Sequence, residues 1–301
     1  MKRLIMLLTA CLLTALGLLA LNAHAADQPA GGDGDATGTD PRGFSPKFMP
    51  YFRYTELENQ LQEQAVTAFG LLKLSERAAL TYEIPVGFKR DVSDTGLRDP
   101  ETGECGGALQ GGPPVLSGGL PTDGDCEETG LGDMNLRFMY KLGSGLGGDW
   151  MIGSQFNFPT ASEHLLGSEQ FQLGPMVTYV RDFEWWPAPG SFGAFMNFYF
   201  FDVFGEGDRD DVSYYLGRWF MMFPLTSPDK GPLLGGWYAL PEFQPMYDFE
   251  EDHFSFWAGP EFGKILAPGR ILYLKPGFGV DPDADKGDRD WSFEMGIRWF
   301  L

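Results

Sequence analysis

Few residues of this chain have the type and spacing that enzyme chemistry requires. Two of its three histidines, His164 and His253, lie in segments predicted to be loops. A hydrolase could use Ser162 or Ser168 with His164, but neighbours this close in one loop are poorly placed to form a nucleophile–base pair. No G-x-S-x-G or H-E-x-x-H motif occurs in the sequence. We therefore expect no catalytic residue and a protein that is not an enzyme.

The acidic segment "DPDADKGDRD" is the best candidate for a metal site. Asp281, Asp283 and Asp285 alternate as in a calcium-binding loop, but Gly287 stands one place late and no Glu closes the loop. The favoured interpretation is that these carboxylates are exposed to solvent and bind nothing, so we expect no metal and no cofactor. Weak cross-linking to lipopolysaccharide phosphates through Mg²⁺ or Ca²⁺ is the alternative.

The start of the chain has the layout of a secretory signal peptide. Lys2 and Arg3 precede an apolar run, and the small residues Ala23 and Ala25 favour cleavage after residue 25. A membrane-spanning helix or a lipoprotein cleavage at Cys11 is the weaker interpretation. Residues 26–47 contain "GGDGDATGTD" and are predicted to be a flexible acidic linker or plug.

The composition limits the remaining 48–301 region to few classes. The net charge of −20 disfavours nucleic acid as a partner, because phosphate binding requires Lys and Arg. After the leader, no apolar run is long enough for a helical membrane span. A membrane crossing would therefore need a closed β-barrel, in which every backbone group is paired between strands.

Segments of about ten residues with alternating polarity favour such a barrel. In "DMNLRFMYKL", Asp133 and Arg137 share one face, while Phe138 and other apolar residues form the opposite face. In "ALTYEIPVGFK", Glu83 likewise opposes a row of apolar residues. The strands of a water-soluble β-sandwich would show the same alternation of polar and apolar residues. Here, however, the connections between the segments are in turn long and acidic or short and nearly neutral. We predict an all-β, antiparallel, up-and-down transmembrane barrel with about 12 strands, although 10 or 14 fit as well. Its long acidic loops would be extracellular and its short turns periplasmic.

The last strand, "SFEMGIRWFL", has apolar side chains on alternate positions up to the last residue. Glu294, Gly296, Trp299 and Leu301 resemble the assembly signal of bacterial outer-membrane barrels, in which Phe is the usual final residue. The resemblance implies recognition by the barrel-assembly machinery, with this strand closing the barrel against the first one.

A second resemblance covers about fifty residues, from Gly130 to Tyr179. "GLGDMNLRFMYKL", "FNFPTAS" and "QFQLGPMVTY" resemble the outer-membrane family named for the MetA pathway of phenol degradation. That family commonly has Pro-Thr-Gly where this chain has Pro159, Thr160 and Ala161. The resemblance implies a barrel related in architecture to long-chain fatty-acid channels.

Strand periodicity yields a hypothesis for the lumen. If polarity turns Asn197 and Arg218 inward, period two also turns inward the residues two and four places away. These are Phe195, Tyr199, Phe201, Tyr214 and Phe220. This aromatic wall would face the polar wall that carries Glu83, Asp133 and Arg137.

We therefore expect an outer-membrane channel for passive uptake of small hydrophobic or aromatic compounds, with membrane lipid and lipopolysaccharide around it. The alternative is a non-transporting structural or adhesive barrel with a filled lumen. The sequence leaves open whether residues 26–47 plug the lumen.

The two cysteines that follow the leader, Cys105 and Cys126, are predicted to form a disulfide in the longest outward loop. A bridge closing a loop of this size stabilises it by about 3 kcal/mol. Mass spectrometry of non-reduced, secreted protein should show the cross-linked peptide. Quantitative alkylation of both thiols would contradict the prediction.

Overall fold

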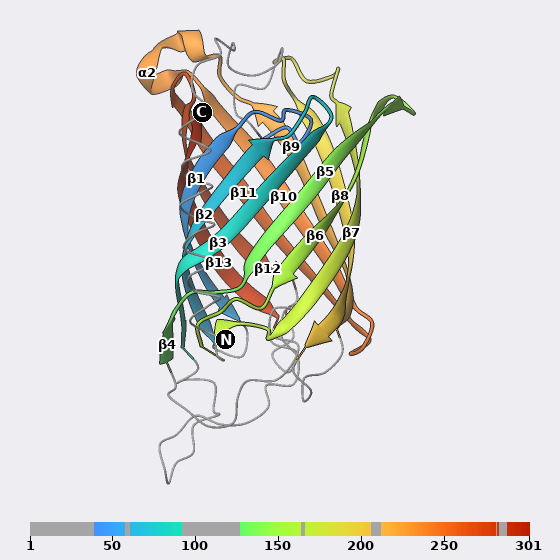
Figure 1. The fold of residues 1–301 in the computed structure, drawn as a ribbon. Coiled ribbons are helices and arrows are strands. Elements are labelled where there is room, and N and C mark those ends of the chain that lie inside the picture. The colour runs from blue at the N-terminus through green and yellow to red at the C-terminus, as the bar shows by residue number, and fades with distance from the viewer. Residues whose placement is uncertain are drawn as a thin grey trace.

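Alternating polar and apolar residues produce long antiparallel strands in the computed structural model of the chain, and these strands close into a barrel (Figure 1). The structure describes residues 39–57, 61–91, 127–163, 166–205, 212–280, 282 and 288–301. Within these ranges, no helix is long and apolar enough to cross a membrane. Several residues singled out from the sequence lie outside them: Cys105, Cys126, His164, Asp281, Asp283, Asp285 and Gly287. The predictions made for those residues stay predictions.

The strands run through the whole described part of the chain. They are β1 (Lys47–Leu57), β2 (Gln62–Lys73), β3 (Ala78–Asp91), β4 (Glu127–Gly130), β5 (Met134–Gly145), β6 (Gly148–Phe158), β7 (Gln170–Asp182), β8 (Phe192–Gly205), β9 (Ser213–Pro224), β10 (Trp237–Asp248), β11 (His253–Ala267), β12 (Arg270–Gly279) and β13 (Arg289–Phe300).

The barrel is closed and has twelve wall positions. Each strand pairs antiparallel with its neighbour along the chain, and β13 pairs with β1 over nine register partners from Lys47 to Leu57. The short β4 and the long β5 both pair with β3, so they occupy one wall position in succession. The predicted fold class is confirmed, and of the strand counts considered, twelve is correct.

The connections alternate between the two ends as the sequence predicts. The turn end carries residues 74–77, 146–147, 183–191, 225–236 and 268–269. At the loop end, the described residues of the connections are 61, 159–163, 166–169, 212, 249–252, 280, 282 and 288. In Figure 1 the turn end, with the C-terminus and α2, lies at the top. One turn is longer than expected, because residues 225–236 fold into η2 (Pro228–Lys230) and α2 (Gly231–Leu234).

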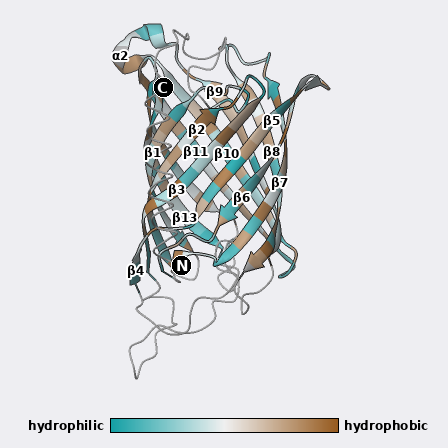
Figure 2. Ribbon diagram, in the orientation of Figure 1, coloured by the Kyte–Doolittle hydropathy of each residue, from teal (hydrophilic) through white to brown (hydrophobic). Residues whose placement is uncertain are grey.

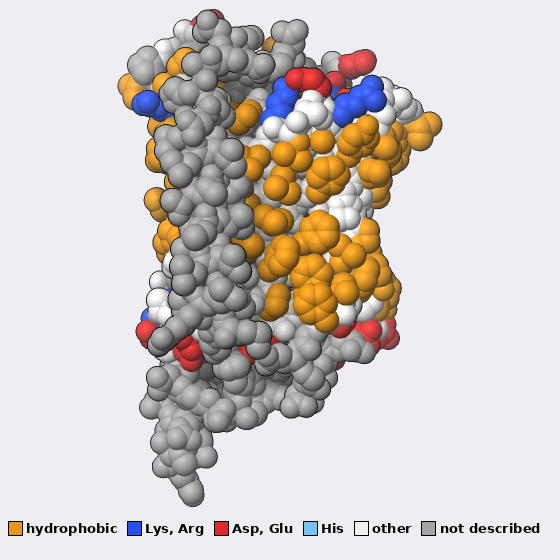
Figure 3. All heavy atoms as spheres, viewed as in Figure 1, with side chains coloured by type: hydrophobic (Ala, Val, Ile, Leu, Met, Phe, Trp, Pro, Cys, Tyr) orange, Lys and Arg blue, Asp and Glu red, His pale blue; other side chains and the backbone are white. Residues whose placement is uncertain are grey.

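Hydrophilic and hydrophobic residues alternate along the strands (Figure 2), and the face seen in Figure 3 has an apolar band between charged side chains at its two ends. Exposed large apolar side chains on separate strands contribute to it, among them Val66, Ile152, Val177, Phe262 and Leu274. A soluble protein would bury such residues, whereas a membrane barrel turns them toward lipid. The wall is therefore built to stand in a bilayer.

Pro85 lies at an irregularity of the ladder, as expected for a residue without an N–H donor. The register between β2 and β3 shifts there: Val66 pairs with Gly87, and Thr67 pairs with Pro85. In contrast, Pro241 and Pro260 lie directly opposite each other in an unshifted stretch of β10 and β11. A proline therefore coincides with a ladder irregularity at Pro85 but not at Pro241 and Pro260.

Gly296 lies at the seam where the barrel closes. It pairs with Tyr51 across the seam and with Tyr273 on the other side. A Cβ at this position would lie 2.7 Å from the Tyr273 hydroxyl and 2.7 Å from the Tyr51 Cβ. Packing against Tyr51 and Tyr273 therefore explains why residue 296 is a glycine. Its role in an assembly signal stays a prediction.

Replacing Gly296 with Ala should destabilise the closed barrel by about 1–3 kcal/mol, because the methyl group overpacks the seam. Urea titration of the folded barrel, followed by tryptophan fluorescence, would measure the change. Gly87→Ala is the matched control, because its Cβ would meet only Val66, at 3.7 Å. Equal midpoints for the two variants would refute the packing explanation.

Candidate functional site

The lumen contains two cavities that meet at a layer of charged side chains. The turn-side cavity has a volume of about 170 Å³ and the loop-side cavity about 260 Å³. Five residues line both cavities, and we call them the girdle: Arg53, Glu83, Arg218, Lys275 and Glu294. They come from strands β1, β3, β9, β12 and β13, so only closure of the barrel brings them together.

Glu242 of β10 links two cations of the girdle. Its carboxylate accepts hydrogen bonds from Arg218 Nε at 2.9 Å and from Lys275 Nζ at 2.7 Å. Gln244 Nε2 donates to the same carboxylate at 2.6 Å. Glu242 is buried, and a buried carboxylate requires partners of this kind, because removing one from water costs several kcal/mol.

The other half of the girdle lies across the closing seam. Arg53 and Glu294 are direct cross-strand partners, and Arg53 Nη2 lies 2.7 Å from Glu294 Oε2. Tyr273 Oη donates to the second oxygen of Glu294 at 2.9 Å. Tyr51 Oη donates to Glu83. This ion pair joins the first and the last strand of the barrel and helps to hold β13 against β1.

A second ion pair lies closer to the turn end. Arg298 Nη2 donates to Glu261 at 2.7 Å, and Tyr238 Oη donates to the other oxygen of Glu261 at 2.7 Å. Arg298 also lies 4.4 Å from the ring centroid of Tyr273, a cation–π distance. All of these side chains are buried except for their edges on the cavity.

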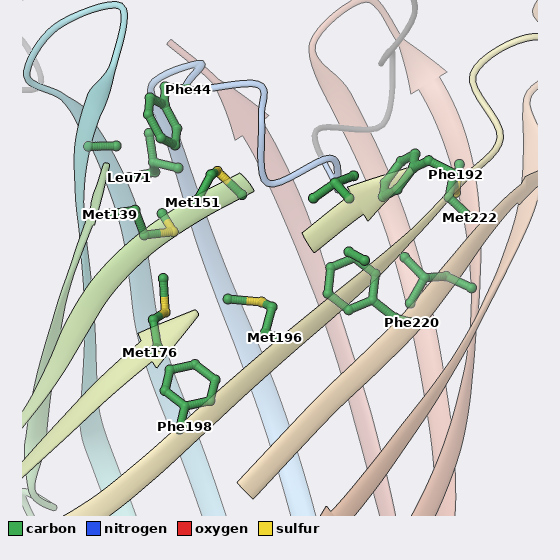
Figure 4. Packing of buried hydrophobic residues seen from close by; sticks show 14 of the residues in the cluster. Phe44, Leu71, Met139, Met151, Met176, Phe192, Met196, Phe198, Phe220 and Met222 are labelled. Atoms are coloured by element: carbon green, nitrogen blue, oxygen red, sulfur yellow. The ribbon is translucent and has the colours of Figure 1, made fainter. Parts of the chain in front are cut away.

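Another part of the lumen wall, on neighbouring strands, is apolar. It belongs to a cluster of buried side chains that is rich in Met and Phe, including Met139, Met196, Phe198 and Phe220 (Figure 4). Met196 and Phe220 also line the turn-side cavity. Methionine is unbranched and polarizable, so such a wall adapts to guests of different shapes.

Residues 39–46 cover part of the turn end from inside. Arg42 contacts Asp40 and Asp182 at 2.6 Å and Asp149 at 3.1 Å, and we call these four residues the latch. Burial alone would lower the pKa of Arg42, but the three carboxylates outweigh it and raise the pKa above its ordinary value. Phe44 is buried in the apolar cluster, with Lys141 Nζ 4.4 Å from its ring centroid.

Asp133 organises the loop end of the polar wall. Its carboxylate accepts hydrogen bonds from the backbone N–H groups of Thr160, Ala161 and Ser168 at 2.7–3.0 Å, and from the Ser168 hydroxyl at 2.8 Å. Burial raises the pKa of Asp133, and these donors partly offset that effect. Asp133 lines the loop-side cavity, but its hydrogen bonds hold the 159–169 connection in place.

The residues predicted for the polar wall lie where the sequence placed them. Glu83, Asp133 and Arg137 line the cavities, and Arg137 donates to Gln155 Oε1 at 2.6 Å. Tyr214 and Phe220 of β9, together with Arg218, also face the lumen as predicted.

The placement predicted for β8 is wrong. Phe195 and Tyr199 are exposed on the outer surface, and Asn197 and Phe201 share their face; the lumen-facing residues are instead Met196, Phe198 and Phe200. Cross-strand partners share a face, and Met196 pairs with Arg218, whereas Asn197 pairs with Gly217. The outward Asn197 is stabilised by hydrogen bonds from Tyr215 Oη at 2.6 Å and Trp219 Nε1 at 3.2 Å.

The charged lumen residues that were not predicted from the sequence include Glu242, Glu261, Lys275 and Arg298. A detectable signal existed, since each charge stands between two apolar residues inside a strand. A charge in a lipid-spanning strand must face the lumen, because facing hydrocarbon costs several kcal/mol. Their pairing could not be inferred, because the partners lie 24–37 positions apart in the chain.

The candidate catalytic residues have structural partners. Ser162 Oγ accepts a hydrogen bond from Leu131 N at 3.0 Å, and Ser168 is held by Asp133. His253 Nε2 lies 2.9 Å from Asp288 at the loop end. Among the residues that the structure describes, no cluster of three His, Cys, Asp or Glu side chains could hold a metal ion.

Comparison with known proteins supports the fold. No protein-family model and no curated protein sequence matches the chain. The NanC porin structure is 8% identical, with a TM-score of 0.52 over 85% of this chain and 100% of that one. An outer membrane channel from Pseudomonas putida F1 is 10% identical, with a TM-score of 0.58 over 92% and 99% of the two chains. This chain has the fold of an outer-membrane β-barrel.

Together with the apolar outer band, this fold places the protein in the bacterial outer membrane. Trp185 and Trp237 at the turn end are partly exposed. They lie where aromatic girdles meet the lipid headgroups in such barrels. Both solved structures are outer-membrane porins or channels by name, but at these identities the likeness shows the fold alone.

The latch predicts how residues 39–46 respond to mutation. Arg42→Gln should expose Phe44 and increase the rate of chymotrypsin cleavage there roughly tenfold, because charge-assisted hydrogen bonds to three carboxylates are lost. Arg181→Gln is the control, since Arg181 is exposed at the same end of the barrel. Equal cleavage rates in the two variants would mean that Arg42 does not hold the segment.

Proposed function

We propose that the barrel is a passive outer-membrane channel for small amphipathic solutes, and for aromatic compounds in particular. The observation that carries the proposal is the pair of water-accessible cavities that meet at the girdle. Together the two cavities extend along the lumen from Asp40 of the latch to Ser168 at the loop end. Ligand sites of this kind combine apolar walls with a few fixed polar groups.

The two-sided lumen favours a solute that is apolar on one side. Met196, Phe198 and Phe220 supply the apolar wall. Nearer the loop end, β6 and β7 carry a polar surface, a chain of side-chain amides in which Gln155 donates to Asn157 at 2.9 Å, and Asn157 donates to Gln172 at 3.0 Å. An aromatic ring could slide along the first wall while a hydroxyl or a charged group exchanges partners along the second.

The resemblance to the MetA-pathway family points in the same direction. Its motifs fall on β5, β6 and β7 and on the 159–169 connection that Asp133 organises. Since no family model matches the chain, the membership and its implied aromatic substrates are part of this proposal.

The proposal includes the processing of the chain. Residues 1–25 would be removed as a signal peptide, residues 26–47 would form a linker or plug, and residues 48–301 would form the barrel. The position of residues 39–46 at the turn-side cavity supports a plug. The barrel-assembly machinery would recognise the strand that carries Glu294, Gly296, Trp299 and Leu301, and lipopolysaccharide would surround the loop end.

A filled, non-transporting barrel is the second candidate, and one observation favours it. The latch and the buried Phe44 hold residues 39–46 against the turn-side cavity, and the charged side chains of the girdle lie where the two cavities meet. A structural barrel would show no conductance in a planar bilayer, whether or not residues 26–47 are present. A channel would conduct, and more so without that segment.

Phe220→Ala should reduce the preference of the channel for phenol over glycerol. One aromatic contact contributes about 0.5–1.5 kcal/mol, so the flux ratio in a liposome swelling assay should fall roughly two- to tenfold. Tyr199→Ala is the matched control, because Tyr199 lies on the outer surface. An unchanged phenol-to-glycerol flux ratio in Phe220→Ala would mean that the solute does not contact the apolar wall during transport.

A further inference from the structure

The charges of the lumen differ in sign from those of the whole chain. The protein carries a net charge of −20. Nevertheless, the side chains that line the two cavities include a slight excess of Lys and Arg over Asp and Glu. The acidic residues concentrate in the loop-end connections, where solvent screens their field beyond about 8 Å at physiological salt. A solute inside the lumen therefore experiences local charges among which the cations slightly outnumber the acids.

Two arginines of the lumen have no carboxylate partner among the described residues. Arg137 donates to the amide oxygen of Gln155, and Arg289 donates to the amide oxygen of Gln244 at 3.4 Å. An amide oxygen satisfies part of the hydrogen-bonding capacity of a guanidinium and leaves its charge uncompensated. Arg289 lines the loop-side cavity, so its charge is presented to a solute that enters from the loop end.

Trp257 completes a site around Arg289. The indole is buried, lines the same cavity, and lies 5.3 Å from the Arg289 guanidinium and 5.2 Å from Lys275 Nζ. It packs flat against the wall where Gly259 and Gly277 leave room, since a Cβ on either glycine would lie 2.0 Å from the ring. Its Nε1–H group is buried and has no hydrogen-bond acceptor in the described structure. A buried indole donor without an acceptor is uncommon.

The acids that line the loop-side cavity are already engaged. Glu294 is paired with Arg53, Glu83 accepts from Tyr51, and Asp133 accepts four hydrogen bonds from the loop. The cations near Trp257 are less fully compensated, because Lys275 shares Glu242 with Arg218.

We propose that the loop-side cavity binds an aromatic monocarboxylate, with the carboxylate on Arg289 beside Trp257 and the ring against Tyr214 and Leu216. Both apolar residues line this cavity. Arg binds carboxylates in a planar, two-pronged geometry that a neutral alcohol cannot reproduce. This proposal rests on the proposed channel function and specifies its substrate class as the anionic form of an aromatic acid.

Single-channel recording with benzoate and benzyl alcohol would test this site. The two probes have similar rings, but only benzoate carries a charge. In wild-type protein, benzoate should block the KCl current at a concentration roughly tenfold lower than benzyl alcohol, as expected for charge-assisted hydrogen bonds. Arg289→Gln should remove this difference, and Arg289→Lys should restore part of it.

A second variant keeps the test independent of folding effects at Arg289. Trp257→Phe retains an aromatic ring but weakens the cation–π contacts that orient Arg289 and Lys275, so it should weaken the benzoate block roughly threefold. Arg270→Gln, an exposed arginine at the turn end, is the control of equal charge and should behave like the wild type.

The outcomes separate the two proposals. Equal block by benzoate and benzyl alcohol in a conducting wild-type channel would overturn the carboxylate site and leave the channel function standing. Absence of any current, with and without residues 26–47, would overturn both. A benzoate preference that survives Arg289→Gln and Trp257→Phe would place the anion elsewhere and would overturn this site.

Discussion

The structure depends on one constraint: a backbone in hydrocarbon must satisfy all its hydrogen bonds within the protein. Twelve antiparallel strands do this only when the last strand pairs with the first, as β13 does with β1. Closure then divides every strand into a lipid face and a lumen face. Charged side chains on these strands face the lumen rather than the lipid, so they lie close together in a polar layer inside the barrel.

That layer has to compensate its own charges. Glu242 joins Arg218 to Lys275, Glu294 joins Arg53 to Tyr273, and Glu261 is paired with Arg298. Removing one member of such a buried pair is far more costly than the pair is stabilising. The girdle therefore stiffens the barrel where the two cavities meet. Arg137 and Arg289, whose side-chain hydrogen bonds go only to amide oxygens, are the positions where a charge is available to a partner from outside.

The low identity to the NanC porin and to the Pseudomonas putida channel has a physical meaning. A barrel wall demands alternation and pairing, and many sequences provide both. The lumen side chains are free to differ, and they decide what the barrel can bind. The function must therefore be argued from the girdle, the apolar wall and the latch rather than from the wall that they share with other barrels.

The sequence by itself determined the barrel, because alternation, acidic loops and a missing helical span are local properties. It also determined the facing of β5, where Asp133, Asn135 and Arg137 fall on one side and apolar residues on the other. It could not determine the facing of β8, which is aromatic on both sides and has only Asn197 in the middle of the strand and Asp202 near its end to indicate a polar face. There the register with β9 decided: Met196 lies opposite Arg218 and faces the lumen. The girdle and the surroundings of Arg289 likewise required tertiary structure, because their residues meet only after the two ends of the sheet have closed.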